Sequence, residues 1–340
     1  MKKILFILTG GTLASTKSEH GLKPGLNAED IFKDLNGMAR HYTITFKELW
    51  ALDSTNMQPE EWQELAGVIY EESDSYDGIV VIHGTDTMAY TSSAVSFMIK
   101  NPKLPIVFTG SQLSIENPIA DAVENCRAAL SMAGSGVPGI YVAFDRKVML
   151  GCRASKTHTK SFDAFESINY PYVALINSGG LEINEKRIIE NDGEMQLDTS
   201  LCTDVFLLKL VPGMEPDILD YLYDKGYKAV YIEAFGRGGI PFMRRNMAEA
   251  VNRVMEKGMI IVVGSQCMYE GSDFSIYEAG RKVLKYGVIE SRDMTTEAAV
   301  TKLMYVLGHT TNIEEIRNEF SKSYCGEIKQ INTKNIRQNI

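Results

Sequence analysis

The sequence predicts a two-domain α/β protein, and three observations lead to this fold class. The 340 residues exceed one average domain, so two domains are expected. Short unbroken apolar runs alternate with amphipathic segments, which is typical of a parallel sheet covered by helices. The alternation lapses in a polar, turn-rich stretch at 186–204, which we interpret as a linker. We therefore expect an N-terminal domain at 1–185 and a smaller C-terminal α/β domain at 205–340.

In the first domain, apolar runs that stop abruptly at glycine or polar residues predict the strands. These strands are expected at 4–8, 43–49, 78–82, 105–109 and 139–144. Pro59, followed by Glu60 and Glu61, predicts the start of a helix. Proline is tolerated there because the first N–H groups of a helix have no intrahelical acceptor, and the carboxylates are stabilised by the positive N-terminal end of the helix dipole. A further helix is expected over 118–132, with Ile119 on its apolar stripe.

The same alternation predicts four strands and four helices in the second domain. The strands are expected at 205–210, 229–235, 259–263 and 288–290, and the helices at about 215–225, 242–257, 275–286 and 295–307. The polar end at 332–340 is expected to fray.

Composition excludes several classes of protein. A net charge of -9 and no concentrated basic patch argue against binding nucleic acid or an anionic membrane surface. The apolar run at 4–8 is too short for a signal peptide, and no later run approaches the length of a membrane span. Five scattered cysteines fit neither a disulfide framework nor a zinc site, so we expect a reducing cytoplasm.

The first motif follows the first predicted strand directly and reads Thr9-Gly10-Gly11-Thr12. This position is the carboxyl end of a strand, where open α/β sheets bind ligands. Two glycines allow a sharp turn and close approach of main-chain N–H groups, and the threonines add hydroxyls. An ordinary polar turn between a strand and a helix is the alternative.

The second motif has the same design after the strand at 78–82 and reads His83-Gly84-Thr85-Asp86-Thr87. As an alternative, Asp86 or Thr87 caps the helix that follows. If the two strands are adjacent in a parallel sheet, the threonines of both motifs lie in one crevice. Neither motif has the spacing of a dinucleotide-binding or phosphate-binding loop, and the chain has no G-x-S-x-G elbow.

A threonine nucleophile needs a base, because its free hydroxyl is weakly nucleophilic at neutral pH. The candidates are His83, His158 and Lys156. We interpret His83 as a structural histidine, since it ends a buried strand. Lys156 and His158 lie in a loop rich in hydroxyls and cations at 151–165, which is either a solvated surface or a cleft that lowers the lysine pKa.

These motifs together resemble the bacterial asparaginase family, and its cytoplasmic type I branch in particular. The similarity rests on the stretches at 9–15, 83–88 and 155–165, and extends to 53–57, 109–112 and 264–268. The resemblance implies a larger N-terminal flavodoxin-like parallel-sheet domain, which would be catalytic, and a smaller C-terminal Rossmann-like domain. It also implies a small-molecule substrate and no metal or organic cofactor. The partner would be further copies of the chain, as a dimer or a dimer of dimers with composite active sites.

The resemblance also implies catalytic roles. Thr12 matches the nucleophile that attacks the side-chain amide carbon and forms an acyl-enzyme ester. Thr85, Lys156 and Asp86 match a second triad, in which the lysine and the acid polarise the threonine hydroxyl for proton transfer. Asp86 would also receive the α-ammonium group of the substrate.

Further positions match the family's substrate-binding groups. Ser54 and Thr55 would hold the α-carboxylate, and the carbonyl of Ser111 would face the leaving amide. Main-chain N–H groups around Gly11 and Thr85 would form the oxyanion hole. The implied substrate-binding residues, besides Asp86, are Gly11, Asp53, Ser54, Thr55, Gly84 and Ser111.

One position departs from the family pattern. The loop at 16–25 usually carries a tyrosine that closes over the site, and here Leu22 stands in its place. Either that hydroxyl is dispensable, or Ser15, Thr16 or His20 replaces it, or the substrate differs. In addition, Gly239 stands where some relatives have an asparagine that contacts the neighbouring subunit.

The expected activity is therefore hydrolysis of L-asparagine to L-aspartate and ammonia. One alternative is a hydrolase of another side-chain amide, such as glutamine or an N-substituted asparagine, because Leu22 makes the lid less polar. The other is a non-catalytic asparagine sensor on the same fold. Thr12, Thr85 and Lys156 together argue against a sensor, which has no use for a nucleophile and a base.

Overall fold

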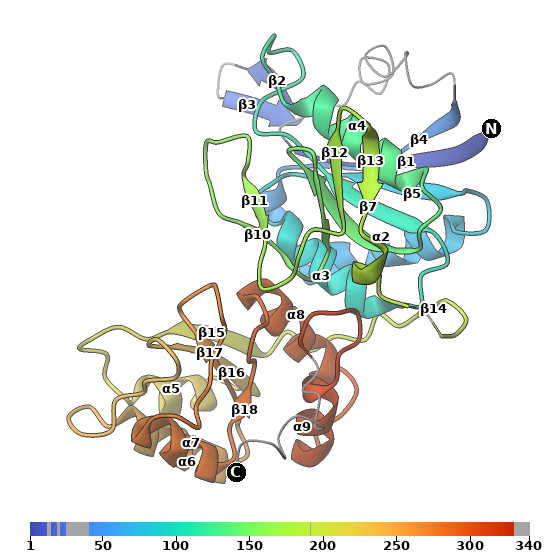
Figure 1. Ribbon diagram of the computed structural model, residues 1–340. Helices are drawn as coiled ribbons and strands as arrows, with labels where there is room; N and C mark the ends of the chain where they lie inside the picture. The colour runs from blue at the N-terminus through green and yellow to red at the C-terminus, as the bar shows by residue number, and fades with distance from the viewer. Residues whose placement is uncertain (12–14, 19–20, 25–40, 191, 330–340) are drawn as a thin grey trace. The chain divides into compact units, whose positions relative to one another are not determined.

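The chain folds as two compact units, Met1–Ser200 and Leu201–Ile340. The computed structural model describes residues 1–11, 15–18, 21–24, 41–190 and 192–329, with only the backbone at 15–18 and 21–24 (Figure 1). Thr12, His20 and the predicted frayed end at 332–340 lie outside these residues. Among the described residues, no helix combines the length and the apolar character needed to cross a bilayer.

An eight-stranded sheet forms the centre of the first unit. Its strands are β1 (Lys2–Gly10), β4 (Tyr42–Leu52), β5 (Gly78–Ile82), β7 (Pro105–Thr109), β8 (Gly139–Phe144), β9 (Lys147–Leu150), β12 (Ala174–Asn177) and β13 (Gly180–Ile183). They lie in the order β13-β12-β9-β8-β7-β5-β1-β4. β4, β1, β5, β7 and β8 run parallel, whereas β9, β12 and β13 continue the sheet antiparallel. The parallel strands therefore have the flavodoxin-like order that the resemblance implies, and the winding reverses between β1 and β5.

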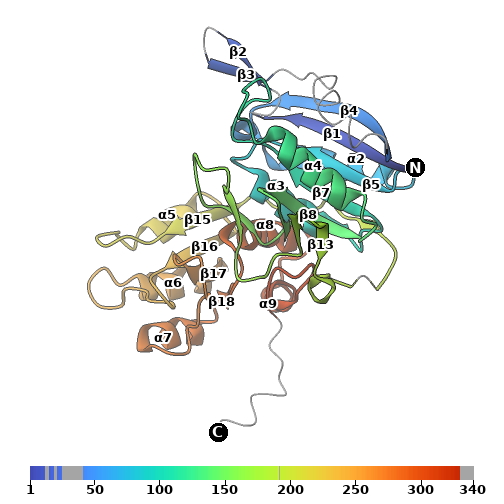
Figure 2. The ribbon, with the colours of Figure 1, turned by 45° about the horizontal axis from the view of Figure 1, so that its top comes forward.

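Helices cover both faces of this sheet. They are α2 (Pro59–Glu72), α3 (Met88–Met98) and α4 (Ala122–Ala133). α4 packs against β5, β7 and β8, while α2 packs against α3. Figures 1 and 2 show α4 on one face of the sheet and α2 with α3 on the other. The shorter elements of the unit are β2 (Ser15–Ser18), β3 (Gly21–Pro24), η2 (Ser54–Asn56), β6 (Ile99–Lys100), β10 (Ala154–Lys156), β11 (Phe165–Ser167), η3 (Glu185–Arg187) and β14 (Gln196–Leu197).

Burial on both faces explains why the strand predictions succeeded. β5 and β7 have the predicted bounds, and every residue in both is buried. β1 is longer than the predicted run at 4–8 at both ends, because Lys2 and Lys3 are exposed but pair with β4, and Thr9 and Gly10 are buried but not apolar. An apolar run therefore marks only those residues of a strand that are both buried and apolar.

The helix predicted over 118–132 begins later than expected. α4 begins at Ala122, and Ile119 is 71% exposed instead of lying on the apolar stripe. The side chain of Asn117 accepts a hydrogen bond from the main-chain N–H of Ile119, and Ala120 N–H donates to the Asn117 carbonyl. This Asx turn competes with helix formation and delays the helix.

The stretch predicted as a linker has structure of its own. η3 overlaps its start, and β14 pairs antiparallel with β6 of the first unit. The division between the units falls after Ser200.

The second unit is a smaller parallel sheet with helices. Its strands, in the order β15-β16-β17-β18, are β15 (Val205–Lys209), β16 (Ala229–Ala234), β17 (Ile260–Ser265) and β18 (Ile289–Glu290). Its helices are α5 (Ile218–Asp224), α6 (Met247–Glu256), α7 (Glu278–Tyr286), α8 (Thr296–Leu307) and α9 (Ile313–Ser321), the last of which was not predicted. One core cluster joins α5, α6 and α7 to the strands, and α8 contacts β15 and β16 (Figure 1).

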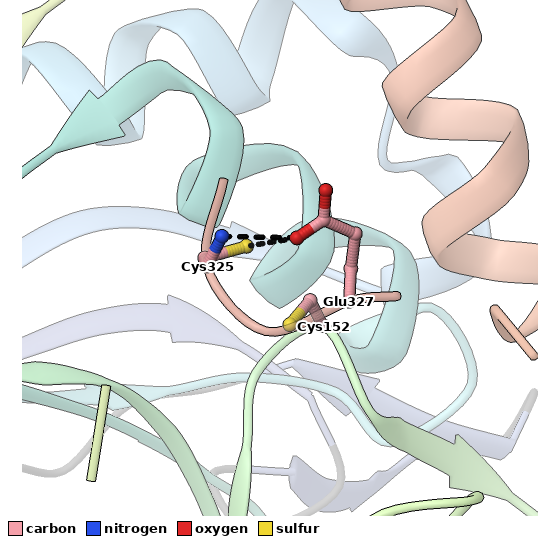
Figure 3. Close-up of side chains that lie close together, drawn as sticks. All are labelled: Cys152, Cys325 and Glu327. Atoms are coloured by element: carbon pink, nitrogen blue, oxygen red, sulfur yellow. Dashed lines mark hydrogen bonds between the residues drawn. The ribbon is translucent and has the colours of Figure 1, made fainter. Parts of the chain in front are cut away.

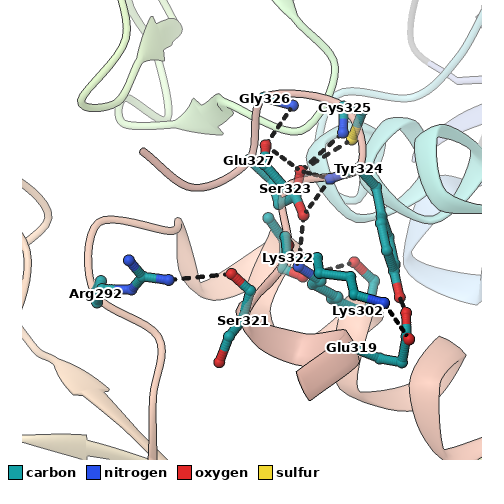
Figure 4. Close-up of polar contacts among 12 residues, drawn as sticks. Arg292, Lys302, Glu319, Ser321, Lys322, Ser323, Tyr324, Cys325, Gly326 and Glu327 are labelled. Carbon is teal, nitrogen blue, oxygen red and sulfur yellow. Dashed lines mark hydrogen bonds and ion pairs between the residues drawn. The ribbon is translucent and has the colours of Figure 1, made fainter. Parts of the chain in front are cut away.

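A fully buried ion pair lies in the second unit between Lys302 of α8 and Glu327 (Figure 4). Lys302 Nζ is 2.6 Å from Glu327 Oε1, and it also donates to the carbonyl of Lys322. The carboxylate accepts the main-chain N–H groups of Tyr324 and Cys325 at 3.0 and 2.9 Å, and Cys325 Sγ lies 3.5 Å away (Figure 3). Glu327 therefore ties the segment after α9 to α8.

Candidate active site

The carboxyl ends of β1 and β5 meet where the winding of the sheet reverses. The two strands are adjacent and parallel, with Leu8 opposite Ile82. Gly11 lies directly against Gly84, because a Cβ built on Gly11 would come within 2.5 Å of Gly84 Cα and N. The two glycine-containing motifs are thus in contact, at the edge where open α/β sheets bind ligands.

The segment at 53–55 completes this edge. A Cβ built on Gly84 would lie 2.6 Å from both Cβ and Oγ of Ser54, which is buried. Asp53 Oδ1 accepts hydrogen bonds from the N–H and the hydroxyl of Thr55, each at 2.9 Å. Thr87 Oγ1 donates to the Ser54 carbonyl at 2.8 Å, so the second motif holds this segment in place.

Gly11→Ala is expected to destabilise the protein by about 3 kcal/mol and to reduce ligand binding at this edge. Gly11 has a φ of +89°, and its new Cβ would meet the backbone of Gly84, which cannot move aside. Urea denaturation measures the effect. Gly67→Ala is the control, because a Cβ there would meet nothing within 4 Å beyond the adjacent backbone of its own helix, and alanine favours helix α2. Equal stabilities of the two variants would contradict the close contact.

Lys156 contacts two side chains of the second motif. Its Nζ donates to Thr85 Oγ1 at 2.7 Å and to Asp86 Oδ1 at 2.6 Å. The Lys156 side chain is 17% exposed, whereas that of Asp86 is 59% exposed. Of the three candidate bases, Lys156 is therefore the one that the structure brings to the Thr85 hydroxyl.

The stretch at 151–165 combines the two predicted alternatives, because residues 158–163 are exposed whereas Lys156 lies in a short strand pair. β10 ends at Lys156 and pairs antiparallel with β11, with Lys156 opposite Phe165. Ala154 and Phe165 are buried, so one side of this short pair anchors in the core. This anchoring aims the amine at Thr85.

The two histidines take other positions. His158 is exposed, and its Nδ1 lies 2.9 Å from Thr157 Oγ1. His83 is buried, with Nδ1 2.7 Å from the carbonyl oxygen of Gly84. Because a carbonyl only accepts, we assign the imidazole proton to Nδ1. Burial lowers the pKa of His83 to about 4, outweighing this hydrogen bond, which acts in the opposite direction. His83 is therefore a neutral structural side chain at pH 7.

The lowered pKa of His83 predicts a loss of stability in acid. Unfolding restores an ordinary pKa of 6.5, so the unfolded chain binds a proton first as the pH falls. Stability is then fully present above pH 6.5 and declines by about 3 kcal/mol as the pH falls to about 4. Urea denaturation across this range measures the slope. The variant His83→Asn keeps a donor near Gly84 but has no titrating ring, so its stability should depend less steeply on pH. An unchanged slope would contradict the assignment.

Ser111 follows β7, and its loop is fixed by contacts of Gln112, Asp121 and Asn125, for which no role was predicted. Ser111 is buried, and its hydroxyl donates to the Leu113 carbonyl at 2.6 Å. The Asp121 carboxylate accepts the N–H groups of Gln112 and Leu113 at 3.0 and 3.2 Å. Asn125 Nδ2 donates to Asp121 at 3.0 Å. A signal was available, because the stretch at 109–112 ends a buried strand just as the two motifs do.

Models of two protein families match this chain. "Asparaginase, N-terminal" matches residues 3–189, and "Glutaminase/Asparaginase C-terminal domain" matches residues 204–320. The chain belongs to the asparaginase family.

Its relatives within the asparaginase family include proteins similar over almost their whole length. An L-asparaginase from Thermococcus kodakarensis is 44% identical to this chain, and the match covers 96% of this chain and 99% of the relative. The solved structure of the thermostable L-asparaginase from that organism has a TM-score of 0.91. The solved L-asparaginase I from Vibrio cholerae is 29% identical, with a TM-score of 0.85 over 97% of this chain and 99% of that one. One component of the glutamyl-tRNA(Gln) amidotransferase from Pyrococcus abyssi is 36% identical over 96% of this chain and 77% of the relative.

Proposed function

We propose that this chain is an L-asparaginase, which hydrolyses L-asparagine to L-aspartate and ammonia. The observation that carries the proposal is the amine of Lys156, largely buried and placed 2.7 Å from the hydroxyl of Thr85 and 2.6 Å from Asp86. A hydrolase needs such an arrangement to move a proton, whereas a binding protein does not. The 44% identity to an L-asparaginase over 96% of the chain supports the same reaction.

In the proposed reaction, the Thr12 hydroxyl attacks the side-chain amide carbon, and its proton passes to the group formed by Thr85 and Lys156, directly or through water. The group formed by Thr85 and Lys156 then returns this proton to the leaving nitrogen, so that collapse of the tetrahedral intermediate breaks the C–N bond, releases ammonia and leaves an ester on Thr12. Water then hydrolyses the ester to aspartate by the same proton path. Main-chain N–H groups at Gly11 and Thr85 stabilise the oxyanion.

The remaining residues of the site would hold the substrate. Asp86 is more than half exposed and so can receive an α-ammonium group while it contacts Lys156. Ser54 and Thr55 bind the α-carboxylate, with Asp53 positioning Thr55 through two hydrogen bonds. The Ser111 carbonyl faces the leaving amide, and Gly84 keeps the space that substrate and Gly11 require.

Ammonia release from a panel of amides tests this function. L-Asparagine is expected to react fastest, because a site built from hydrogen-bonding groups discriminates strongly against a chain of different length. The panel also contains L-glutamine, D-asparagine and N-substituted asparagines, which test whether Leu22 admits a larger amide. Saturable binding of asparagine with no ammonia would identify a sensor and refute the proposal.

We further propose a cytoplasmic type I enzyme that assembles as a dimer or a dimer of dimers with composite sites. The similarity to L-asparaginase I of Vibrio cholerae supports the branch, and the odd number of scattered cysteines supports a reducing compartment. Exposed apolar side chains on the second unit, including Met243, Tyr269 and Tyr277, support an interface. Light scattering coupled to size exclusion tests the assembly, and a monomer that retains full activity would contradict composite sites.

A further inference from the structure

The side-chain amide of Gln112 lies between the Thr85 hydroxyl and the loop that follows Lys156. Its Nε2 donates to the main-chain carbonyls of Ser161 and His158, at 3.1 and 3.5 Å. Its Oε1 accepts from Thr85 Oγ1 at 3.4 Å. Because carbonyl oxygens only accept, the NH₂ group must face the loop and the oxygen must face Thr85.

The main chain at Gln112 is fixed as firmly as its amide. The N–H of Gln112 lies 3.0 Å from both oxygens of Asp121. Asn125 donates to Asp121 and to the Gly110 carbonyl at 3.0 Å each, and its Oδ1 accepts the N–H of Asp145 at 2.9 Å. This network of matched donors and acceptors gives the Gln112 side chain a rigid base.

The position of Gln112 Oε1 determines where the Thr85 proton points. Lys156 donates to one lone pair of the Thr85 hydroxyl, so the hydroxyl proton must be directed to another acceptor. Gln112 Oε1 is the acceptor that the described contacts provide. At 3.4 Å this bond is longer than the usual O–H···O distance of about 2.7 Å, so it aligns the proton without trapping it.

We propose that Gln112 is a positioning residue, which aligns the Thr85 hydroxyl and couples it to the loop at 157–164. The loop begins directly after Lys156, so one amide joins the hydroxyl to the segment that follows the amine, which the pairing of β10 with β11 holds in place. A misplaced hydroxyl leaves binding of asparagine intact but slows the proton transfer, and this consequence rests on the proposed function. The coupling to the loop does not depend on it.

Gln112→Met tests both halves of the proposal, because methionine keeps the length of the side chain and removes the donor and the acceptor. We expect kcat for asparagine to fall about tenfold with KM changed less than about twofold. We also expect trypsin to cut severalfold faster after Lys160, which is exposed in the loop, since the loop opens more often. The control is Gln63→Met in α2, because Gln63 Nε2 also donates to a main-chain carbonyl, that of Thr199, at 2.6 Å.

The outcomes separate positioning from a merely structural role. The thermal unfolding midpoints of Gln112→Met and Gln63→Met should fall by similar amounts, with kcat lowered only in the former. A wild-type kcat, an effect on KM alone, or a wild-type cleavage rate at Lys160 overturns the proposal. If the unaltered chain releases no ammonia, the proposed function has failed. The rate of cleavage after Lys160 in Gln112→Met then decides by itself whether Gln112 holds the loop at 157–164.

Discussion

Thr85→Ala is expected to release ammonia from asparagine at least about a thousandfold more slowly than the unaltered chain. The change removes the hydroxyl that Lys156 contacts at 2.7 Å and leaves the amine paired with Asp86. In the proposed reaction, this change removes the hydroxyl through which the amine takes up the proton of the nucleophile. Steady-state kinetics measure kcat and KM. Thr12→Ala should show a loss of similar size, because it removes the proposed nucleophile.

Two controls distinguish lost chemistry from lost structure. Thr85→Ser keeps a hydroxyl within reach of Lys156 and should retain activity within about tenfold of the unaltered chain. Calorimetric binding of L-aspartate to Thr85→Ala should remain, since Asp86, Ser54 and Thr55 are unaltered. Full activity in Thr85→Ala and Thr12→Ala would refute the threonine mechanism. Loss of aspartate binding along with activity would instead indicate a damaged site.

The buried part of the fold was readable from the sequence because burial on both faces leaves an unambiguous pattern. β5 and β7 have predicted bounds, and each is buried along its whole length. The antiparallel strands β12 and β13 were missed because they alternate buried or half-buried residues with exposed ones over only four residues. Such short segments do not differ from loops in their local pattern.

The candidate site was predictable where its residues follow buried strands. Gly11 and Gly84 lie in contact because two adjacent parallel strands end at the same edge. Lys156 could be assigned only through the family resemblance, since the pairing that aims it joins β10 to β11 across a hydroxyl-rich stretch. A pairing between segments that are polar in sequence has no periodic signal.

Gln112 and Asp121 were missed for a different reason. Their roles depend on side-chain contacts between a loop and the start of α4, and these contacts have no fixed spacing in sequence. The error at Ile119 has a related cause, the Asx turn of Asn117 in the same loop. The predicted helix began at 118, but residues 118–121 precede α4, because the N–H groups of Ile119 and Ala120 donate to Asn117 instead. A polar network near a site therefore disrupts the local pattern from which helices are predicted.

Glu327→Gln is expected to reduce the free energy of unfolding by about 4 kcal/mol. The side chains of Lys302 and Glu327 are both fully buried, so the variant leaves a buried ammonium without its counter-charge. Chemical denaturation measures the loss. The control is Glu215→Gln, because Glu215 pairs with Arg245 at 2.6 Å but both side chains are at least half exposed. That change should cost less than about 1 kcal/mol.

The pH dependence of this effect follows from the pKa of Glu327. Burial alone would raise the pKa of Glu327. The charge of Lys302, its hydrogen bond to Glu327 and the N–H groups of Cys325 and Tyr324 outweigh burial, so the pKa lies below its ordinary value of 4.5. A lowered folded-state pKa means that the stability is present above the unfolded value of 4.5 and is lost as the pH falls below it. Glu327→Gln should lack this acid step while keeping the decline that His83 causes between pH 6.5 and about 4.

Removing both charges should be far less costly than removing one. In the double variant Lys302→Met with Glu327→Leu, neither desolvation cost remains, and replacing a buried ion pair by apolar side chains of similar volume is often neutral. The N–H groups of Tyr324 and Cys325 would lose their acceptor, so we expect recovery to within about 2 kcal/mol of the unaltered chain. If the double variant is as unstable as Glu327→Gln, the pair matters because it anchors the segment after α9, and not because an unpaired charge is costly.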